Sequence, residues 1–217
     1  MVLGTGGHGR ESLEVIEAIA TAGGAFEPIG FLDDDATQRG STINDYPVLG
    51  TRDWLIGRQT KTTLAIGIAS PAVRFAVVRW AQANGIDIPS LVHPACQISR
   101  RAVLGAGIML MAGTRVSTNV VVADFVHINV GCSISHDCRL GPFSTIGPGA
   151  YLAGAVTVEE GAEFGTGAVA RPGAAVGRWS IIGAGAAVAV DVPANSVAVG
   201  VPARVIRTRE EGWHQSL

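Results

Sequence analysis

Charge, aromatic rings and lysine are all scarce in this sequence of 217 residues. Charged residues make up 16% of the chain, aromatic residues 6%, and lysine occurs once, at position 61. Hydrophobic residues nevertheless reach 47%. Intrinsically disordered chains combine high charge with few branched aliphatic residues, so this composition excludes disorder. The formal net charge of −2 gives no electrostatic basis for binding nucleic acid or an anionic membrane.

Long apolar runs and paired cysteines are also missing. No run reaches the roughly 18 apolar residues of a transmembrane helix, and Met1 is not followed by a basic region and an apolar signal core. The three cysteines are an odd number, and without a secretory signal they predict a reducing cytoplasm. The 29 glycines fall well short of one residue in three, which excludes a collagen helix.

What the sequence does contain is a repeat of six residues. From Val92 to Val188, every sixth residue is apolar, for seventeen consecutive positions. Four residues after each of these lies a second small or apolar residue, from Cys96 to Val192. A period of six fits neither an α-helix nor a single alternating strand, but it is typical of a hexapeptide β-helix.

In such a β-helix, three hexads form one coil of 18 residues, so the repeat predicts between five and six coils. The apolar residue of each hexad points into the prism. We expect Cys96, Cys132 and Cys138, at the second repeat position, to be buried as small apolar residues. Glycines near the corners are expected to supply backbone conformations that other residues adopt only at a cost. They are Gly105, Gly107, Gly141, Gly147, Gly149, Gly165, Gly167, Gly177, Gly183 and Gly185.

Before Val92 the period of six is absent, and strand and helix patterns alternate. Apolar segments predict strands at residues 2–3, 28–32 and 62–68. Amphipathic segments predict one helix from about Glu11 to Ala20 and another from Pro71 to Gly85. This order predicts a Rossmann-like βαβ domain with a parallel sheet. The expected fold class is therefore α/β over residues 1–90, followed by an all-β parallel β-helix over residues 91–217.

A glycine-rich loop joins the first predicted strand to the first predicted helix. Gly4, Gly6 and Gly9 match the pattern G-x-G-x-x-G. Acidic residues, Asp33 and Asp34, follow the second predicted strand. Without Cβ atoms, such a turn lets backbone N–H groups at a helix N-terminus approach phosphate oxygens, so we expect the loop to bind a nucleotide. The strand before the loop is short, and we expect the natural chain to begin several residues earlier.

Segments spread over the chain resemble the PglD/NeuD family of sugar acyltransferases. The matching segments are GTGGHGR (4–10), GFLDDD (30–35), YPVLGT (46–51), AIG (65–67), LVHPAC (91–96), HINVGCSISHDCRLG (127–141), IIGAGAAV (181–188) and VGVPARVIR (199–207). The resemblance implies an N-terminal nucleotide-sugar-binding domain, a left-handed β-helix and a homotrimer. It also implies transfer of an acetyl group from acetyl-CoA to a sugar, often to the amino group of a UDP-4-amino-sugar.

Among the five histidines, the resemblance singles out His136, which the repeat places on an outward corner. It implies that His136 is the general base, since neutral imidazole can take a proton from an amine or hydroxyl that attacks a thioester. Asp137 would strengthen this base and fix its tautomer. We expect His93 to be structural and His214 to be solvated in the polar tail. His127 is expected either to be structural or to line a cleft.

The resemblance also implies which residues bind the two substrates. On the sugar-nucleotide side they are Gly6, Gly7, His8, Gly9, Asp33, Asp34 and Gly67, although loop solvation and helix capping would also explain the two aspartates. On the acetyl-CoA side they are Thr166, Gly167, Ala184 and Gly154, whose backbone N–H would stabilise the oxyanion. Arg171 and Arg178 could contact CoA phosphates or simply be solvated. Some family members carry a second histidine where this chain has Thr145, so its contribution is missing here.

Other functions fit parts of the sequence. The same base could acetylate a sugar hydroxyl, and a non-catalytic scaffold would bind nucleotide without transferring anything. A γ-type carbonic anhydrase also uses a trimeric hexapeptide β-helix, but it needs three histidine ligands for zinc, and only His127 and His136 are suitably placed. NAD could occupy the glycine loop, yet the repeat offers no hydride-transfer domain. We therefore expect no metal and no redox cofactor.

Overall fold

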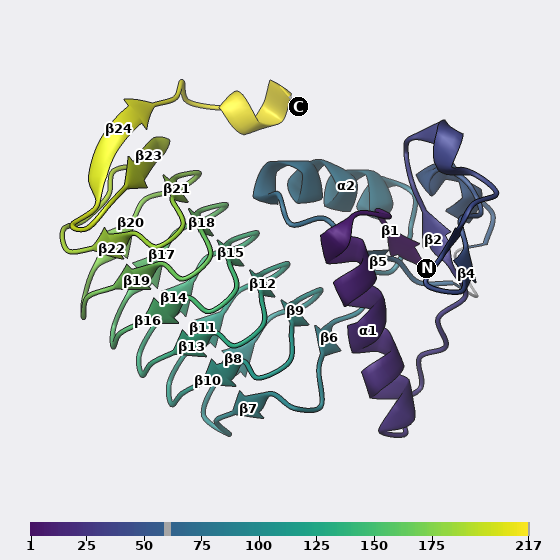
Figure 1. Cartoon of the computed structure of the whole chain (residues 1–217), viewed down its shortest axis with the longest axis horizontal. Helices are drawn as coiled ribbons and strands as arrows, with labels where there is room; N and C mark the ends of the chain where they lie inside the picture. Colours follow the sequence, from purple (N-terminus) through teal and green to yellow (C-terminus); the bar gives the residue numbers. More distant parts are fainter. Residues whose placement is uncertain (59–61, 217) are drawn as a thin grey trace. The chain divides into compact units, whose positions relative to one another are not determined.

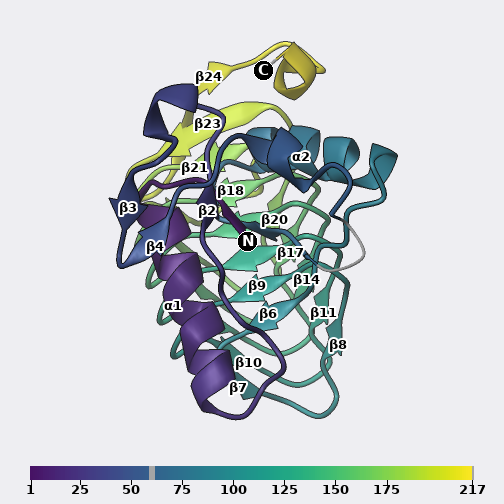
Figure 2. The ribbon, with the colours of Figure 1, turned by 90° about the vertical axis from the view of Figure 1, so that its right-hand side faces the viewer.

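The computed structural model describes residues 1–58 and 62–216. The chain divides into two compact units, Met1–Pro94 and Ala95–Leu217. The first unit contains a parallel sheet in the order β2-β1-β5. Its strands are β1 (Val2–Leu3), β2 (Phe31–Leu32) and β5 (Ala65–Ile66), and its helices are α1 (Gly7–Thr21) and α2 (Pro71–Ala83). This is the predicted α/β arrangement, and α1 lies against β1 and β5 (Figure 1). Figure 2 shows both helices of this unit from a second side.

Both predicted helices are present, with one difference in length. The helix α2 begins at Pro71 as predicted and ends at Ala83, just before Gly85, which has φ 65°. The helix α1 begins at Gly7 rather than Glu11, because the second half of the glycine loop forms its first turn. The strand β1 has its predicted length, while β2 and β5 are shorter than the predicted strands at 28–32 and 62–68. The remaining elements of this unit are η1 (Ala36–Gln38), β3 (Thr42–Ile43), β4 (Tyr46–Pro47), η2 (Arg52–Leu55) and β6 (Leu91–Val92).

The second unit is a parallel β-helix with three faces, whose coils are stacked in Figure 1. The first face contains β7 (Gln97–Ile98), β10 (Arg115–Val116), β13 (Ser133–Ile134), β16 (Tyr151–Leu152), β19 (Val169–Ala170) and β22 (Ala187–Val188). The second face contains β8 (Val103–Leu104), β11 (Val121–Val122), β14 (Arg139–Leu140), β17 (Thr157–Val158) and β20 (Ala175–Val176). The third face contains β9 (Met109–Leu110), β12 (His127–Ile128), β15 (Thr145–Ile146), β18 (Glu163–Phe164), β21 (Ile181–Ile182), β23 (Ser196–Val199) and β24 (Arg204–Thr208).

Strand pairing confirms the predicted coil of 18 residues. Arg115 pairs with Ser133, and Ser133 pairs with Tyr151, each exactly one coil apart in the sequence. The repeat residues from Leu110 to Val188 are buried and fill the prism. The last coil is shorter, because Ile181 pairs with Val197, only 16 residues later. The chain then reverses into the antiparallel strand β24.

The corner glycines fall into two groups. The sequence predicted that all ten would adopt an unusual backbone conformation, and this prediction needs correction. Gly107, Gly149, Gly167 and Gly185 have φ between 62° and 67°, the left-handed region expected for a tight corner. The other six predicted corner glycines do not have a left-handed φ. A Cβ atom on Gly147, for example, would lie 2.6 Å from the carbonyl oxygen of Phe164 in the next coil. These glycines are required by the close approach of neighbouring coils.

Two burial predictions need correction at the ends of the β-helix. Cys132 and Cys138 are buried as predicted, but Cys96 is only half-buried, because it lies in the first coil. His214, predicted to be solvated, is 8% exposed. Its ring stacks on Trp179, with ring centroids 3.6 Å apart, because the tail folds back through the short helix η3 (Trp213–Ser216).

Burial raises the pKa of Cys132 to about 11, so this thiol is unreactive.

Candidate active site

His136 and Asp137 lie at the corner where the chain passes from β13 on the first face to β14 on the second. Nδ1 of His136 is 2.8 Å from Oδ2 of Asp137, and the two side chains are 61% and 52% exposed. An ionised carboxylate only accepts hydrogen bonds, so this contact favours the tautomer with the proton on Nδ1. Nε2 is then the nitrogen that can accept a proton.

Gly154 occupies the same corner one coil later, eighteen residues after His136. A Cβ atom on Gly154 would lie 2.3 Å from Cε1 and 2.4 Å from Nε2 of His136. The imidazole ring therefore packs directly on the Gly154 backbone, and only glycine leaves room for it. Among the described residues, the N–H of Gly154 meets no acceptor, so this residue in contact with the ring retains an unused hydrogen-bond donor.

A third side chain, Asn119, was not predicted from the sequence. It contacts the His136–Asp137 pair from the preceding coil. Nδ2 of Asn119 donates to Oδ1 of Asp137 at 3.0 Å. Hydrogen bonds from Asn119 and His136 hold the pKa of Asp137 below its usual value, and the charge of Arg139 acts in the same direction. The signal that could have found Asn119 is the coil length, since it precedes Asp137 by eighteen residues.

The predicted acetyl-CoA residues other than Gly154 lie at a different corner of the prism. Thr166 and Gly167 follow β18, and Ala184 follows β21, where the chain passes from the third face to the first. The N–H of Gly185 donates to the carbonyl of Thr166 at 2.8 Å, so these corners stack on one another. The topology thus separates them from His136, because the two corners form opposite edges of the first face.

Three glycines of the first unit pack against one another at the predicted nucleotide loop. Gly4 has φ 103°. A Cβ atom on Gly9 would lie 1.9 Å from the carbonyl oxygen of Gly4. A Cβ atom on Gly67 would lie 2.5 Å from the Cα of Gly9. Gly6 and Gly7, at the start of α1, have open space where a side chain would be. The loop therefore packs tightly on its inner side and leaves its backbone accessible on the other.

His8 lies on this loop, close to a buried arginine that the sequence reasoning missed. Burial, together with the positive charge of Arg74, lowers the pKa of His8 to about 4. His8 is therefore neutral at physiological pH and can donate or accept a hydrogen bond. Arg74 is fully buried on α2, where Nη1 donates to the carbonyl groups of Ala69 at 2.9 Å and Ile68 at 3.1 Å. No sequence pattern distinguished Arg74 from a surface residue of α2.

The two candidate aspartates form hydrogen bonds within the first unit. Asp33 accepts from the backbone N–H of Thr5 at 2.9 Å and from its hydroxyl at 2.6 Å, which ties β2 to the glycine loop. Partial burial alone would raise the pKa of Asp33, but the hydrogen bonds from Thr5 and Asp35 outweigh burial and lower it. Asp34 forms an ion pair with Arg52. Asp33 therefore fixes the glycine loop, and Asp34 connects the end of β2 to η2.

The two candidate CoA arginines are already paired with carboxylates. Arg171 lies 3.5 Å from Asp191 and donates to the carbonyl of Ala189 at 2.7 Å. The guanidinium of Arg178 lies 2.5 Å from Glu211. These contacts are exposed and therefore weak, so a phosphate could compete for either arginine.

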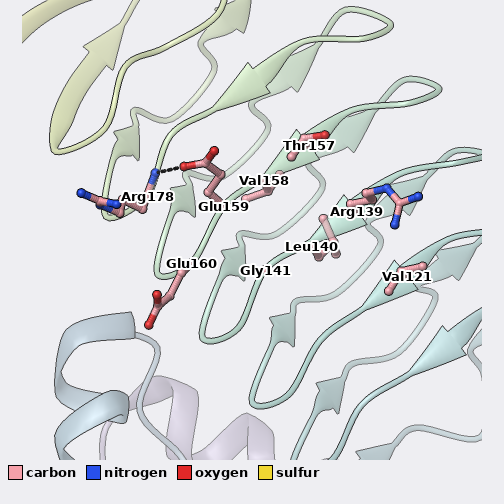
Figure 3. Close-up of a pocket in the computed structure, with 9 residues that line it drawn as sticks. All are labelled: Val121, Arg139, Leu140, Gly141, Thr157, Val158, Glu159, Glu160 and Arg178. Atoms are coloured by element: carbon pink, nitrogen blue, oxygen red, sulfur yellow. Dashed lines mark hydrogen bonds between the residues drawn. The ribbon is translucent and has the colours of Figure 1, made fainter.

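Arg178 also lines a shallow hollow of about 380 Å³ on the second face (Figure 3). Its backbone N–H donates to Glu159 at 2.9 Å. The other lining residues are Val121, Arg139, Leu140, Gly141, Thr157, Val158 and Glu160. Neither His136 nor Asp137 lines this hollow, so it is separate from the corner that carries the candidate base.

The remaining histidines and acidic residues do not form a metal site in the described chain. His127 is 3% exposed and pairs along the third face with Thr145, while His93 is half-buried. Within residues 1–58 and 62–216, no three His, Cys, Asp or Glu side chains converge as metal ligands. None of the described helices is long and apolar enough to cross a membrane.

Comparison with known proteins connects this geometry to a family. The family model of the PglD N-terminal domain matches residues 1–81. GDP-perosamine N-acetyltransferase of Escherichia coli O157:H7 is 30% identical over 166 residues, which cover 76% of this chain and 74% of that protein. The chain belongs to the PglD/NeuD family of sugar acyltransferases. The resemblance inferred from the sequence motifs is therefore confirmed.

Solved structures of similar proteins extend the match to nearly the whole chain. The acetyltransferase domain of PglB from Neisseria gonorrhoeae, in complex with acetyl coenzyme A, is 34% identical with a TM-score of 0.85, over 94% of this chain and 97% of that one. PerB from Caulobacter crescentus, in complex with CoA and GDP-perosamine, is 32% identical with a TM-score of 0.84, over 95% and 96%. The predicted fold class, an α/β unit followed by a left-handed parallel β-helix, is confirmed.

Proposed function

We propose that this protein transfers an acetyl group from acetyl-CoA to the amino group of a nucleotide-linked sugar, with His136 as the general base. The observation that carries the proposal is the His136 ring, held by Asp137 at 2.8 Å and packed on the backbone of Gly154. Relatives in complex with acetyl coenzyme A and with CoA plus GDP-perosamine support the two substrate classes.

The chemistry follows from a base and a hydrogen-bond donor lying side by side. The sugar amine attacks the acetyl carbonyl carbon, and Nε2 of His136 takes the proton that the nitrogen loses. The N–H of Gly154 donates to the carbonyl oxygen as it becomes negatively charged. The carbon–sulfur bond then breaks, and the imidazolium returns its proton to the departing thiolate. Asp137 stabilises the imidazolium in between.

On the sugar-nucleotide side, we propose that the glycine loop of the first unit binds the diphosphate. Backbone N–H groups at the start of α1 favour anions, and Gly6, Gly7 and Gly9 let a phosphate approach closely. Neutral His8 adds a hydrogen bond, and Gly67 and Asp33 hold the loop in shape. Asp34, paired with Arg52, completes the sugar-nucleotide side. A UDP-4-amino-sugar is the first substrate to test, followed by GDP-perosamine, because a relative acts on it.

On the acetyl-CoA side, we propose that the protein works as a homotrimer. Gly154 lies beside His136, but Thr166, Gly167 and Ala184 lie at the opposite edge of the first face. In a cleft between two neighbouring prisms, the edge of one chain that carries His136 would face the edge of the next chain that carries the other acetyl-CoA residues. The three free thiols agree with a reducing compartment, and we place the reaction in the cytoplasm.

The His136→Ala variant tests the proposal directly. We expect kcat to fall by about 10²- to 10⁴-fold, the usual contribution of a general base. Thiol release from acetyl-CoA is measured with UDP-, GDP- and CMP-linked 4-amino-sugars and with their 4-hydroxy analogues. The matched control is His93→Ala, which changes a half-buried histidine outside the site.

Three results would contradict parts of the proposal. Full activity of His136→Ala would remove the assigned base. Acetylation of the hydroxy analogue but not of the amine would make the enzyme an O-acetyltransferase. A thermal unfolding midpoint that acetyl-CoA does not raise, together with no turnover, would leave only a nucleotide-binding scaffold.

A further inference from the structure

One hydrogen-bonded chain crosses two coils of the β-helix at the candidate active corner. Nδ2 of Asn119 donates to Oδ1 of Asp137 at 3.0 Å, and Oδ2 of the same carboxylate lies 2.8 Å from Nδ1 of His136. Each carboxylate oxygen therefore has its own partner. Because a carboxylate can only accept, it is the amide NH₂ of Asn119, not the amide oxygen, that must face Asp137.

The backbone fixes Asn119 in position for this contact. Asn119, Asp137 and Ala155 occupy successive coils of one corner, with φ of 59°, 62° and 58°. Asparagine tolerates this left-handed conformation better than most residues. Its amide oxygen accepts from the hydroxyl of Thr118 at 3.3 Å, which holds the NH₂ group toward Asp137.

Asp137 needs this second anchor because its corner is open to solvent. The His136 and Asp137 side chains are 61% and 52% exposed, and exposed ion pairs contribute little and are poorly fixed in water. Asn119 is also the main reason that the pKa of Asp137 is lowered, ahead of His136 and Arg139. The carboxylate therefore stays ionised and oriented by groups of two coils.

We propose that Asn119 is a positioning residue, which orients the Asp137 carboxylate so that His136 keeps its proton on Nδ1 and presents Nε2 as the base above Gly154. This inference rests on the proposed role of His136 in acetyl transfer. The side chain of Asn119 contacts Asp137 and Thr118 rather than the His136 ring, so its removal should lower the fraction of His136 that is correctly oriented. We therefore expect kcat to change and the KM for both substrates to stay the same.

Two variants of Asn119 separate hydrogen bonding from shape. Asn119→Ala removes the donor, and Ala155 demonstrates that alanine is accommodated at this corner. Asn119→Asp keeps the size and the left-handed tolerance but places a carboxylate against Asp137. We expect kcat to fall about 10- to 100-fold in both variants, the usual effect of losing a group that orients a functional side chain. Arg101→Ala is the matched control, because Arg101 is exposed one coil earlier and eighteen residues before Asn119.

The His136 tautomer provides a readout that does not depend on turnover. Two-bond ¹⁵N–¹H correlation spectra of ¹⁵N-histidine-labelled protein identify the protonated ring nitrogen, and His136→Ala assigns the signal. The native protein and Arg101→Ala should show the proton on Nδ1, while both Asn119 variants should show mixed tautomers. Native kcat and an unchanged tautomer in both Asn119 variants would overturn the inference. If His136→Ala alone keeps full activity, the proposed function fails instead, and the spectra still report whether Asn119 orients the ring.

Discussion

At the scale of single residues, the coil length decides which side chains meet. Asn119 and Asp137 are eighteen residues apart, as are His136 and Gly154, and both pairs are in contact because successive coils repeat the same corner. Substitutions at this corner should therefore lower kcat more than they lower the stability of the fold. Gly154 offers the sharpest test of that expectation.

We expect Gly154→Ala to reduce kcat about as strongly as His136→Ala, by 10²-fold or more. The new Cβ atom would lie 2.3 Å from Cε1 of His136, so the imidazole ring must leave its position. Gly154 does not have a left-handed φ, and its backbone accepts alanine. Steady-state kinetics and the thermal unfolding midpoint of the single and double variants are the measurements.

The double variant Gly154→Ala/His136→Ala should be no slower than His136→Ala alone, because the ring that alanine displaces is already absent. A further tenfold loss in the double variant would show that Gly154 acts independently of His136.

At the scale of elements, the β-helix is built from two kinds of corner glycine. Gly149 is needed for its left-handed φ of 63° and has open space around it. Gly147 is needed because the next coil passes too close for a Cβ atom. Its own N–H donates to the carbonyl of Phe164 at 2.8 Å, so the clash and the hydrogen bond involve the same pair of coils.

The two glycines should therefore differ in the cost of replacement by alanine. We expect Gly149→Ala to lower the free energy of unfolding by about 1 kcal/mol, the strain of one left-handed residue. Gly147→Ala should cost about 3 kcal/mol, because the backbones of two coils must separate. Urea unfolding followed by circular dichroism measures both. Equal costs would contradict the division of the corner glycines into two groups.

At the scale of the whole molecule, the candidate residues for acetyl-CoA and for proton transfer lie on opposite edges of one face. Residues at opposite edges of one face do not meet within one prism, so a neighbouring copy is the simplest way to bring them into one cleft. We expect sedimentation equilibrium to give a mass of about 67 kDa, three times the 22.3 kDa of one chain. Mixing His136→Ala chains with chains altered at Thr166 and Ala184 should restore activity if the site is shared. An active monomer, or no restored activity in mixed trimers, would contradict a shared site.

The fold was largely predictable because its causes are local and periodic. Seventeen apolar positions six residues apart indicate one architecture, the hexapeptide β-helix. The helix α2 was predictable from local signals, a proline at its start and a glycine after its end. The corner position of His136 followed from the same register. The burial of Arg74 and His214 was not predictable from a repeat. Arg74 reaches back to the carbonyl groups of Ile68 and Ala69 just before its own helix, and His214 stacks on Trp179, which is distant in the sequence.

The sequence alone therefore determined the coil, its length of 18 residues and the outward position of the His136–Asp137 pair. Only the tertiary structure decided what surrounds that pair, Gly154 beneath the ring and Asn119 on the second carboxylate oxygen. In the first unit, it likewise decided that Arg74 lies close to His8. The physical reason is that periodicity specifies where a Cα atom lies in the prism. The direction of each side chain, and the partner that satisfies its hydrogen bonds, depend on atoms contributed by neighbouring coils and helices.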